Sequence, residues 1–161
     1  MVTIRRARRA DVDPIVAMLA DDELGARREN LGDPRYLDAF DALDADPNQF
    51  LAVAELDGEI VGTLQLSYLA GLSRLGATRA QIEAVRVRSD QRGSGLGTVL
   101  FEWAINEARE RGAVLVQLTT DASRADAHRF YERLGFVASH VGMNRVSTLE
   151  SWWFICAICN S

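Results

Sequence analysis

The sequence predicts a single α/β domain with a mixed, mostly antiparallel central sheet flanked by helices. Strand-like and helix-like segments alternate along the chain, which is typical of this class. The pair Asp57-Gly58 stands between two apolar segments, as in a tight turn between antiparallel strands. The 161 residues, 48% of them hydrophobic, are enough for one core and too few for two large ones. We therefore expect one domain over residues 1–145.

The elements are expected in the order strand, helix, helix, hairpin, strand, helix, strand, helix, strand. Up to the last helix their ranges are 2–7, 10–23, 32–46, 49–56 with 59–69, 81–87, 96–111, 113–120 and 125–136, and the last strand is expected after that helix. Asp11 and Asp33 are expected N-caps, because short polar side chains accept hydrogen bonds from the first free amides of a helix. Gly112 and Gly135 are expected to end the last two helices.

Apolar periodicity assigns the buried faces. In the helix at 96–111 the expected buried residues are Leu96, Val99, Leu100, Trp103 and Ala104. The continuous apolar run at 113–120 suits a strand inside the sheet. In the strand at 81–87, simple alternation would place Glu83, Val85 and Val87 on one face.

Three glycines at every second position join that strand to the helix at 96–111. Gly93, Gly95 and Gly97 allow backbone amides to approach a ligand closely, and a helix start presents free amides with partial positive charge. A negatively charged ligand is expected here. A Walker-type loop is excluded, because Thr98 follows the last glycine and the chain has no lysine. A dinucleotide fingerprint requires G-x-G-x-x-G, whereas the spacing here is G-x-G-x-G.

The charge and hydropathy of the chain indicate which classes of partner it can bind. The net charge is −5, which argues against nucleic acid, and the basic cluster at residues 5–9 is interpreted as a strand end with solvated arginines. No apolar run reaches the roughly 18 residues that span a membrane. The N-terminus lacks the apolar stretch of a secretory signal. We expect a cytoplasmic protein without a membrane partner.

Two segments carry a family resemblance. The stretch "VRVRSDQRGSGLGTVLFEWAINEARERG", followed by "LTTDASRADAHRFYERLGF", resembles the GNAT superfamily of acyl-CoA-dependent N-acetyltransferases. That family's coenzyme motif, Q/R-x-x-G-x-G/A, is met by Arg92, Gly95 and Gly97. The strand before the motif, the helix after it and the later "FYERLGF" stand in the family's order, and the resemblance extends to about Arg145.

The resemblance implies acetyl-CoA as co-substrate, no metal, and a primary amine, small or peptidic, as acceptor. It implies that the coenzyme pyrophosphate binds the backbone of Arg92, Gly93, Ser94, Gly95, Leu96, Gly97 and Thr98. It also implies a strand that separates from its neighbour, so that the backbone of Val85, Arg86 and Val87 pairs with the pantetheine arm.

Two catalytic residues follow from the same resemblance. Tyr131 matches the family tyrosine that protonates the departing sulfur, and Glu83 is a candidate general base acting through water. An ordinary core aromatic and a surface glutamate are their alternative interpretations. The alternative for the whole chain is a non-catalytic acyl-CoA-binding or sensing module, which would keep the glycine loop and not need Tyr131.

Some features stay open. Arg124 replaces the asparagine that the family often has seven residues before the tyrosine, and it could contact a coenzyme phosphate or face solvent. The acidic region 21–46 could favour cationic amines or be a solvated face. Residues 146–161, with Cys156 and Cys159, are an apolar tail expected to be an extra strand, an interface segment of a possible homodimer, or a non-native extension. Two thiols are too few for a zinc site.

Overall fold

The computed structural model describes residues 1–21 and 25–145. The chain divides into two compact units, residues 1–118 and 119–161. The first unit contains β1 (Thr3–Arg6), η1 (Arg9–Asp11), α1 (Val12–Ala20), α2 (Gly25–Arg28), α3 (Arg35–Ala45), β2 (Gln49–Leu56), β3 (Glu59–Leu69), α4 (Ser73–Gly76), β4 (Arg79–Val87), η2 (Ser89–Gln91), α5 (Leu96–Glu110) and β5 (Leu115–Leu118). In the described part of the second unit lies α6 (Ala125–Arg133). The predicted behaviour of the tail at 146–161 lies outside the described residues.

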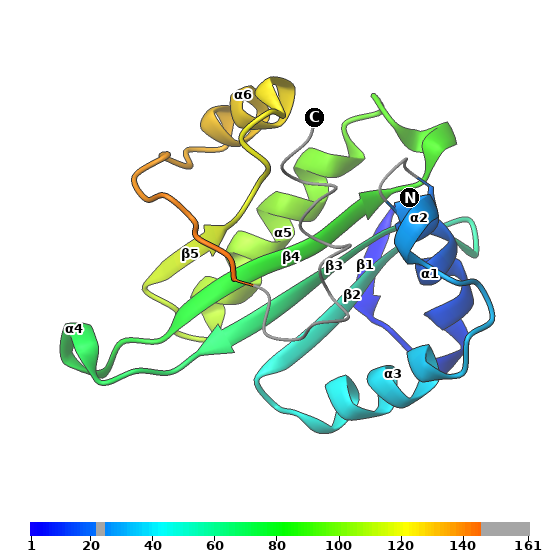
Figure 1. Ribbon diagram of the computed structural model, residues 1–161, viewed down its shortest axis with the longest axis horizontal. Coiled ribbons are helices and arrows are strands. Elements are labelled where there is room, and N and C mark those ends of the chain that lie inside the picture. Colours follow the sequence, from blue (N-terminus) through cyan, green and yellow to red (C-terminus); the bar gives the residue numbers. More distant parts are fainter. Residues whose placement is uncertain (22–24, 146–161) are drawn as a thin grey trace. The chain divides into compact units, whose positions relative to one another are not determined.

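One five-stranded sheet forms the centre of the first unit, in the order β1-β2-β3-β4-β5 (Figure 1). The first four strands pair antiparallel and β5 pairs parallel to β4, which confirms the predicted fold class. The hairpin turn between β2 and β3 is also confirmed, because Asp57 and Gly58 both have positive φ, at 52° and 85°. Two positive φ values are what a type I′ turn requires.

The short strand β5 pairs along its whole length with the first half of β4. Their register runs from Arg79 opposite Leu115 to Ile82 opposite Leu118, where β5 ends. The second half of β4, from Glu83 to Val87, therefore continues beyond the parallel ladder while β3 still pairs with its other edge. A strand edge of this kind offers backbone groups to a ligand.

A bulge in β4 corrects the simple alternation expected for that strand. Gln65 of β3 pairs with Glu83, but Thr63 pairs with Arg86, so β4 holds one extra residue. Ala84 has a φ of 50°, which accommodates it. Residues directly opposite in an antiparallel pair share a face. Glu83 therefore shares a face with Arg86 and not with Val87, and the expectation for Val87 was wrong.

Helix α5 packs on β3 and β4 and supplies the apolar core of one sheet face (Figure 1). Leu96, Leu100 and Ala104 are buried as expected, whereas Val99 is 44% exposed and Phe101 takes part in the core instead. Gly62 of β3 permits this close packing, because a Cβ there would stand 2.9 Å from Leu100 Cδ1. The glycine thus allows α5, whose first turn follows the glycine loop, to pack closely on β3.

The opposite sheet face is partly covered by α1 and α3 (Figure 1). Ala7, Val12, Ile15, Val16, Phe40 and Val53 form its core. Asp33 acts much as expected at the start of α3, since its carboxylate accepts the Arg35 amide at 3.0 Å. Asp11 stands at the N-cap position of α1 as expected, but its side chain makes no capping hydrogen bond to that helix. Instead it is buried and ion-paired with Arg5 at 2.7 Å, and it accepts the Arg8 amide.

The Arg5–Asp11 pair gives a stability prediction. The Arg5 guanidinium is the main cause that holds the pKa of Asp11 below its ordinary value. A lowered carboxyl pKa contributes stability at higher pH, and that contribution is lost as pH falls through the folded-state pKa. We expect Asp11→Asn to lower the free energy of unfolding by about 2 kcal/mol at neutral pH, measured by urea denaturation.

The difference between Asp11→Asn and the parent protein should shrink below about pH 3.8, where the unfolded-state carboxyl becomes protonated. Asp13→Asn is the matched control, because Asp13 is an exposed residue of the first turn of α1. The role given to the Arg5–Asp11 pair would be contradicted if both variants lost the same free energy of unfolding. It would also be contradicted if the stability difference between Asp11→Asn and the parent protein did not change with pH down to strong acid.

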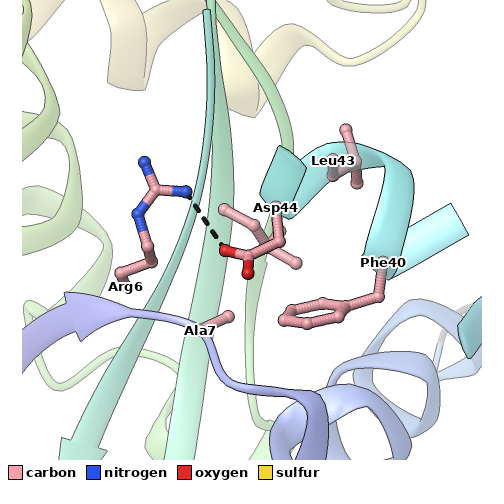
Figure 2. A pocket seen from close by; sticks show the side chains of 6 residues that line it. Arg6, Ala7, Phe40, Leu43 and Asp44 are labelled. Atoms are coloured by element: carbon pink, nitrogen blue, oxygen red, sulfur yellow. Dashed lines mark ion pairs between the residues drawn. The ribbon is translucent and has the colours of Figure 1, made fainter. Parts of the chain in front are cut away.

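The basic cluster at residues 5–9 is largely ion-paired. Arg6 faces Asp44 at 3.6 Å and Arg9 pairs with Asp41, so two acids of the 21–46 region are engaged there. Figure 2 shows Arg6 and Asp44 pointing toward one another beside Phe40. The hollow that they line has no room for a water molecule. It is therefore a packing gap and not a binding site.

Candidate active site

The glycine loop between β4 and α5 has the backbone that the sequence indicated. Gly93 and Gly95 have φ values of 80° and 88°, and Gly95 is the residue before the first turn of α5. A Cβ at either glycine would meet no atom of residues 1–21 and 25–145 within 4 Å, so these residues leave the loop open to a ligand. Left-handed φ and an open approach are the two properties that glycine supplies here.

Four amides of this loop are available to a ligand. Those of Gly93, Gly95, Gly97 and Thr98 have no acceptor among the residues that the structure describes. The neighbouring amides are used internally: Arg92 donates to Ser89 O, Ser94 to Gln91 O, and Leu96 to Ser94 Oγ. Successive free amides at a helix start form a concave, partly positive surface that suits phosphate oxygens.

The Arg92 side chain holds the loop to the end of α1. Its guanidinium donates to Asp21 Oδ2 at 2.9 Å, to Asp21 O at 3.1 Å and to Val87 O at 3.3 Å. Both side chains of the ion pair are about half exposed. The Arg92 side chain thus stabilises the loop through its contacts with Asp21 and Val87. The coenzyme motif alone did not indicate this role.

Glu83 lies on the exposed part of the sheet face opposite α5. It stands across from Gln65, and its Oε1 accepts a hydrogen bond from Gln81 Nε2 at 2.8 Å. Its second oxygen has no hydrogen-bond donor within residues 1–21 and 25–145. Glu83 is therefore an exposed, oriented carboxylate beside the half of β4 that β5 does not pair.

The three residues expected to pair with pantetheine occupy that same half of β4. Arg86 and Val87 pair with Thr63 and Gly62 of β3, and Val85 follows the bulged Ala84. The Val85 carbonyl accepts a hydrogen bond from the Arg86 guanidinium at 2.9 Å. The residues are partly buried, as strand positions beside an open edge are.

Helix α6 carries Tyr131 in the second unit. The Tyr131 ring packs edge-on against Phe130 and Phe136, with centroids 5.5 and 6.2 Å away. Its carbonyl accepts the amides of Leu134 and Phe136, which closes the helix before Gly135. The ring is partly buried and contacts both of these aromatic rings.

Arg124 and His128 have structural roles at the start of α6. Arg124 precedes the helix, is exposed, and its carbonyl accepts the His128 amide. His128 Nε2 lies 3.0 Å from Asp121 O. The coenzyme contact expected for Arg124 stays a prediction.

A groove that the sequence did not predict lies between α1 and the first residues of β3. It has a volume of about 260 Å³ and is lined by residues that include Met18, Asp21, Ile60 and Arg88. No motif marks these positions, because they come from three separate elements. The groove adjoins Asp21, the residue to which Arg92 is tied.

Within the described ranges, no three histidine, cysteine, aspartate or glutamate side chains gather as metal ligands. A search of the same residues for a helix long and apolar enough to cross a membrane finds none.

Together, the sheet, the half of β4 that extends beyond β5 and the glycine loop define an acyltransferase-type α/β fold. The chain belongs to the acetyltransferase (GNAT) family, whose sequence model matches residues 16–136. An aminoalkylphosphonate N-acetyltransferase of Salmonella typhimurium is 34% identical over 137 residues, which cover 85% of this chain and 86% of that protein. The family and its named relatives make the chain an N-acetyltransferase by class.

Two solved structures share the fold. A structure described as a transcriptional regulator from Bacillus halodurans C-125 is 48% identical with a TM-score of 0.86, covering 91% of this chain and 99% of that one. A putative acetyltransferase from Agrobacterium tumefaciens is 27% identical with a TM-score of 0.83, covering 90% and 99%.

Proposed function

We propose that the protein transfers an acetyl group from acetyl-CoA to a primary amine by direct attack in a ternary complex. The observation that carries the proposal is the set of four acceptor-free amides in the glycine loop, at Gly93, Gly95, Gly97 and Thr98. A pyrophosphate offers several anionic oxygens, and such amides at a helix start are suited to bind them.

The second half of β4 would hold the pantetheine arm. Because β5 ends opposite Ile82, the outer edge of residues 83–87 has no parallel partner strand within the described part of the chain. An extended ligand with amide groups can add to such an edge as a further strand would. The thioester supplies an activated acyl group, and the chain's own residues supply orientation and proton transfer.

Two proton transfers are needed. The attacking amine must be neutral, and Glu83, exposed and held by Gln81, is the proposed base acting through a water molecule. The departing sulfur must gain a proton, and Tyr131 is proposed as its donor because of its place in the family motif. Arg124 is proposed as a further coenzyme contact, by its position alone.

The proposal is tested by measuring free thiol release from acetyl-CoA with a panel of amines. The panel should include 2-aminoethylphosphonate, because a relative is named an aminoalkylphosphonate N-acetyltransferase. Amine-dependent release is expected, together with acetyl-CoA binding by calorimetry. A folded protein that binds no acetyl-CoA would overturn the proposal. A cytoplasmic location, independence from metal and a homodimer remain predictions.

Glu83→Gln gives a pH prediction. If an ionised Glu83 is the base, this variant should weaken or shift the ascending limb of the pH-rate profile for kcat/KM. Glu102→Gln is the matched control, since Glu102 is exposed on α5. Identical profiles for Glu83→Gln, Glu102→Gln and the parent protein would remove Glu83 from the mechanism.

A second candidate function is a non-catalytic acyl-CoA-binding or sensing module. It is favoured by the 48% identical structure that is described as a transcriptional regulator. Acetyl-CoA binding without acetylation of any amine in a broad panel would support this second function.

A further inference from the structure

A continuous row of polar side chains crosses four strands on the sheet face opposite α5. We define it as the glutamine strip: Gln49 on β2, Gln65 and Ser67 on β3, Gln81 and Glu83 on β4, and Gln117 on β5. The strand register places its members side by side, because Gln49 pairs with Ser67, Ser67 with Gln81, and Gln81 with Gln117. Gln65 and Glu83 are also directly opposite each other.

Hydrogen bonds orient the strip in two neighbouring groups, one around Gln49 and one around Gln81. Gln49 Oε1 accepts from Gln65 Nε2 at 2.9 Å and from Ser67 Oγ at 2.8 Å. Gln81 Oε1 accepts from Gln117 Nε2 at 2.9 Å, while Gln81 Nε2 donates to Glu83. Fixing a glutamine side chain costs about 1.5–2 kcal/mol of rotamer entropy. Glutamines that were only solvated would not need to form these hydrogen bonds with one another. Preorganised polar groups lower the cost of binding a ligand.

The strip keeps unused hydrogen-bonding capacity. Gln65 Oε1, Gln49 Nε2 and Glu83 Oε2 have no partner among the described residues. Gln49, Gln65, Gln81 and Gln117 are partly buried, and Glu83 is exposed. The strip therefore offers both acceptors and donors, arranged around the carboxylate that we propose as the base.

We infer that the glutamine strip selects the amine acceptor and that this acceptor carries neutral hydroxyl or amide groups. The inference rests on the proposed acetyl transfer. Gln49 lies two strands away from Glu83 and two residues further along the register, since Gln49 is in line with Ser67 and Gln81. At about 4.8 Å per strand and about 3.4 Å per residue, this is roughly 12 Å. The polar groups of the acceptor should thus extend up to about 12 Å from its nitrogen, as in an amino sugar or a short peptide.

The chemistry of the strip argues against an anionic acceptor. Phosphonates and carboxylates are recognised best by the paired donors of arginine. Arg79 at one end of the strip donates to Gln117, and Arg86 beyond Glu83 donates to the Val85 carbonyl. The donors at the centre of the strip are carboxamides, which match neutral oxygens and amides.

The test compares four acceptors: glucosamine, the peptide Gly-Gly-Gly, 2-aminoethylphosphonate and butylamine. Glucosamine or the peptide should have the highest kcat/KM, and the preferred one identifies the source of the neutral groups. Binding of each amine to the complex of the enzyme with coenzyme A, by calorimetry, gives a readout independent of turnover.

Gln65→Leu should raise the KM for the preferred polar amine by roughly 5- to 100-fold, because a polar group of the bound amine would lose its hydrogen-bond partner. Butylamine should be unaffected or improved. Gln49→Leu should give a smaller loss, since Gln49 orients Gln65. Asn106→Leu on α5 is the control that replaces an exposed amide elsewhere.

The outcomes distinguish a failure of the proposed acetyl transfer from a failure of the role given to the glutamine strip. Failure to bind acetyl-CoA would defeat the proposed function itself. If the protein binds acetyl-CoA, three results would overturn the role of the strip. The four amines could be used or bound equally, butylamine or 2-aminoethylphosphonate could be preferred, or no amine could bind. Gln65→Leu and Asn106→Leu variants that both retain the parent selectivity would also overturn it.

Discussion

Tyr131→Phe should lower kcat by about 10² to 10⁴ while leaving acetyl-CoA affinity and thermal stability nearly unchanged. The substitution removes one hydroxyl and keeps the ring that packs between Phe130 and Phe136. Loss of a positioned general acid costs that much in rate, whereas loss of an ordinary hydrogen bond costs about 1 kcal/mol, which is less than tenfold. Steady-state kinetics with an accepted amine, and calorimetry for the coenzyme, separate the two effects.

Tyr68→Phe is the matched control for this variant. The Tyr68 hydroxyl is buried and has no hydrogen-bond partner among the described residues. Its removal should leave kcat unchanged. A Tyr131→Phe enzyme that retains full turnover would show that the tyrosine is only a packing residue of α6.

Gly95→Glu should weaken acetyl-CoA binding by at least about 100-fold. A Cβ at Gly95 would meet no atom of the described residues within 4 Å, so the added side chain has room beside the loop amides, where it would bring a negative charge close to a bound pyrophosphate. Two like charges about 5 Å apart repel by roughly 3 kcal/mol at an effective dielectric constant near 20, which corresponds to about 10² in affinity. Calorimetric titration with coenzyme A measures the loss.

Gly58→Glu provides the control for backbone strain and charge. Gly58 has a φ of 85°, close to the 88° of Gly95, and a Cβ added there would likewise meet no atom within 4 Å. Both variants should therefore lose similar stability. Equal coenzyme affinity in the two variants, each folded by circular dichroism, would show that the glycine loop is not the pyrophosphate site.

Much of the local structure could be predicted because it depends on neighbouring residues. The Asp57-Gly58 turn, the glycine loop and the end of α6 at Gly135 all require a particular backbone φ at one or two positions. The four predicted helices are present, and α1 begins at Val12, directly after the expected cap residue Asp11. The Asp11 side chain, however, makes no capping hydrogen bond to α1 and pairs instead with Arg5, six residues away in the chain.

The sequence by itself determined the order of the elements, the glycine loop before α5 and the family resemblance, because each rests on a short pattern of residue types. Only the tertiary structure decided which side chains share a face of the sheet. The bulge at Ala84 moves Arg86 to the face of Glu83, and strand register gathers glutamines from four strands into one strip. Register depends on pairing between distant segments, so a single residue of slip reverses every side chain that follows, and no local pattern records it.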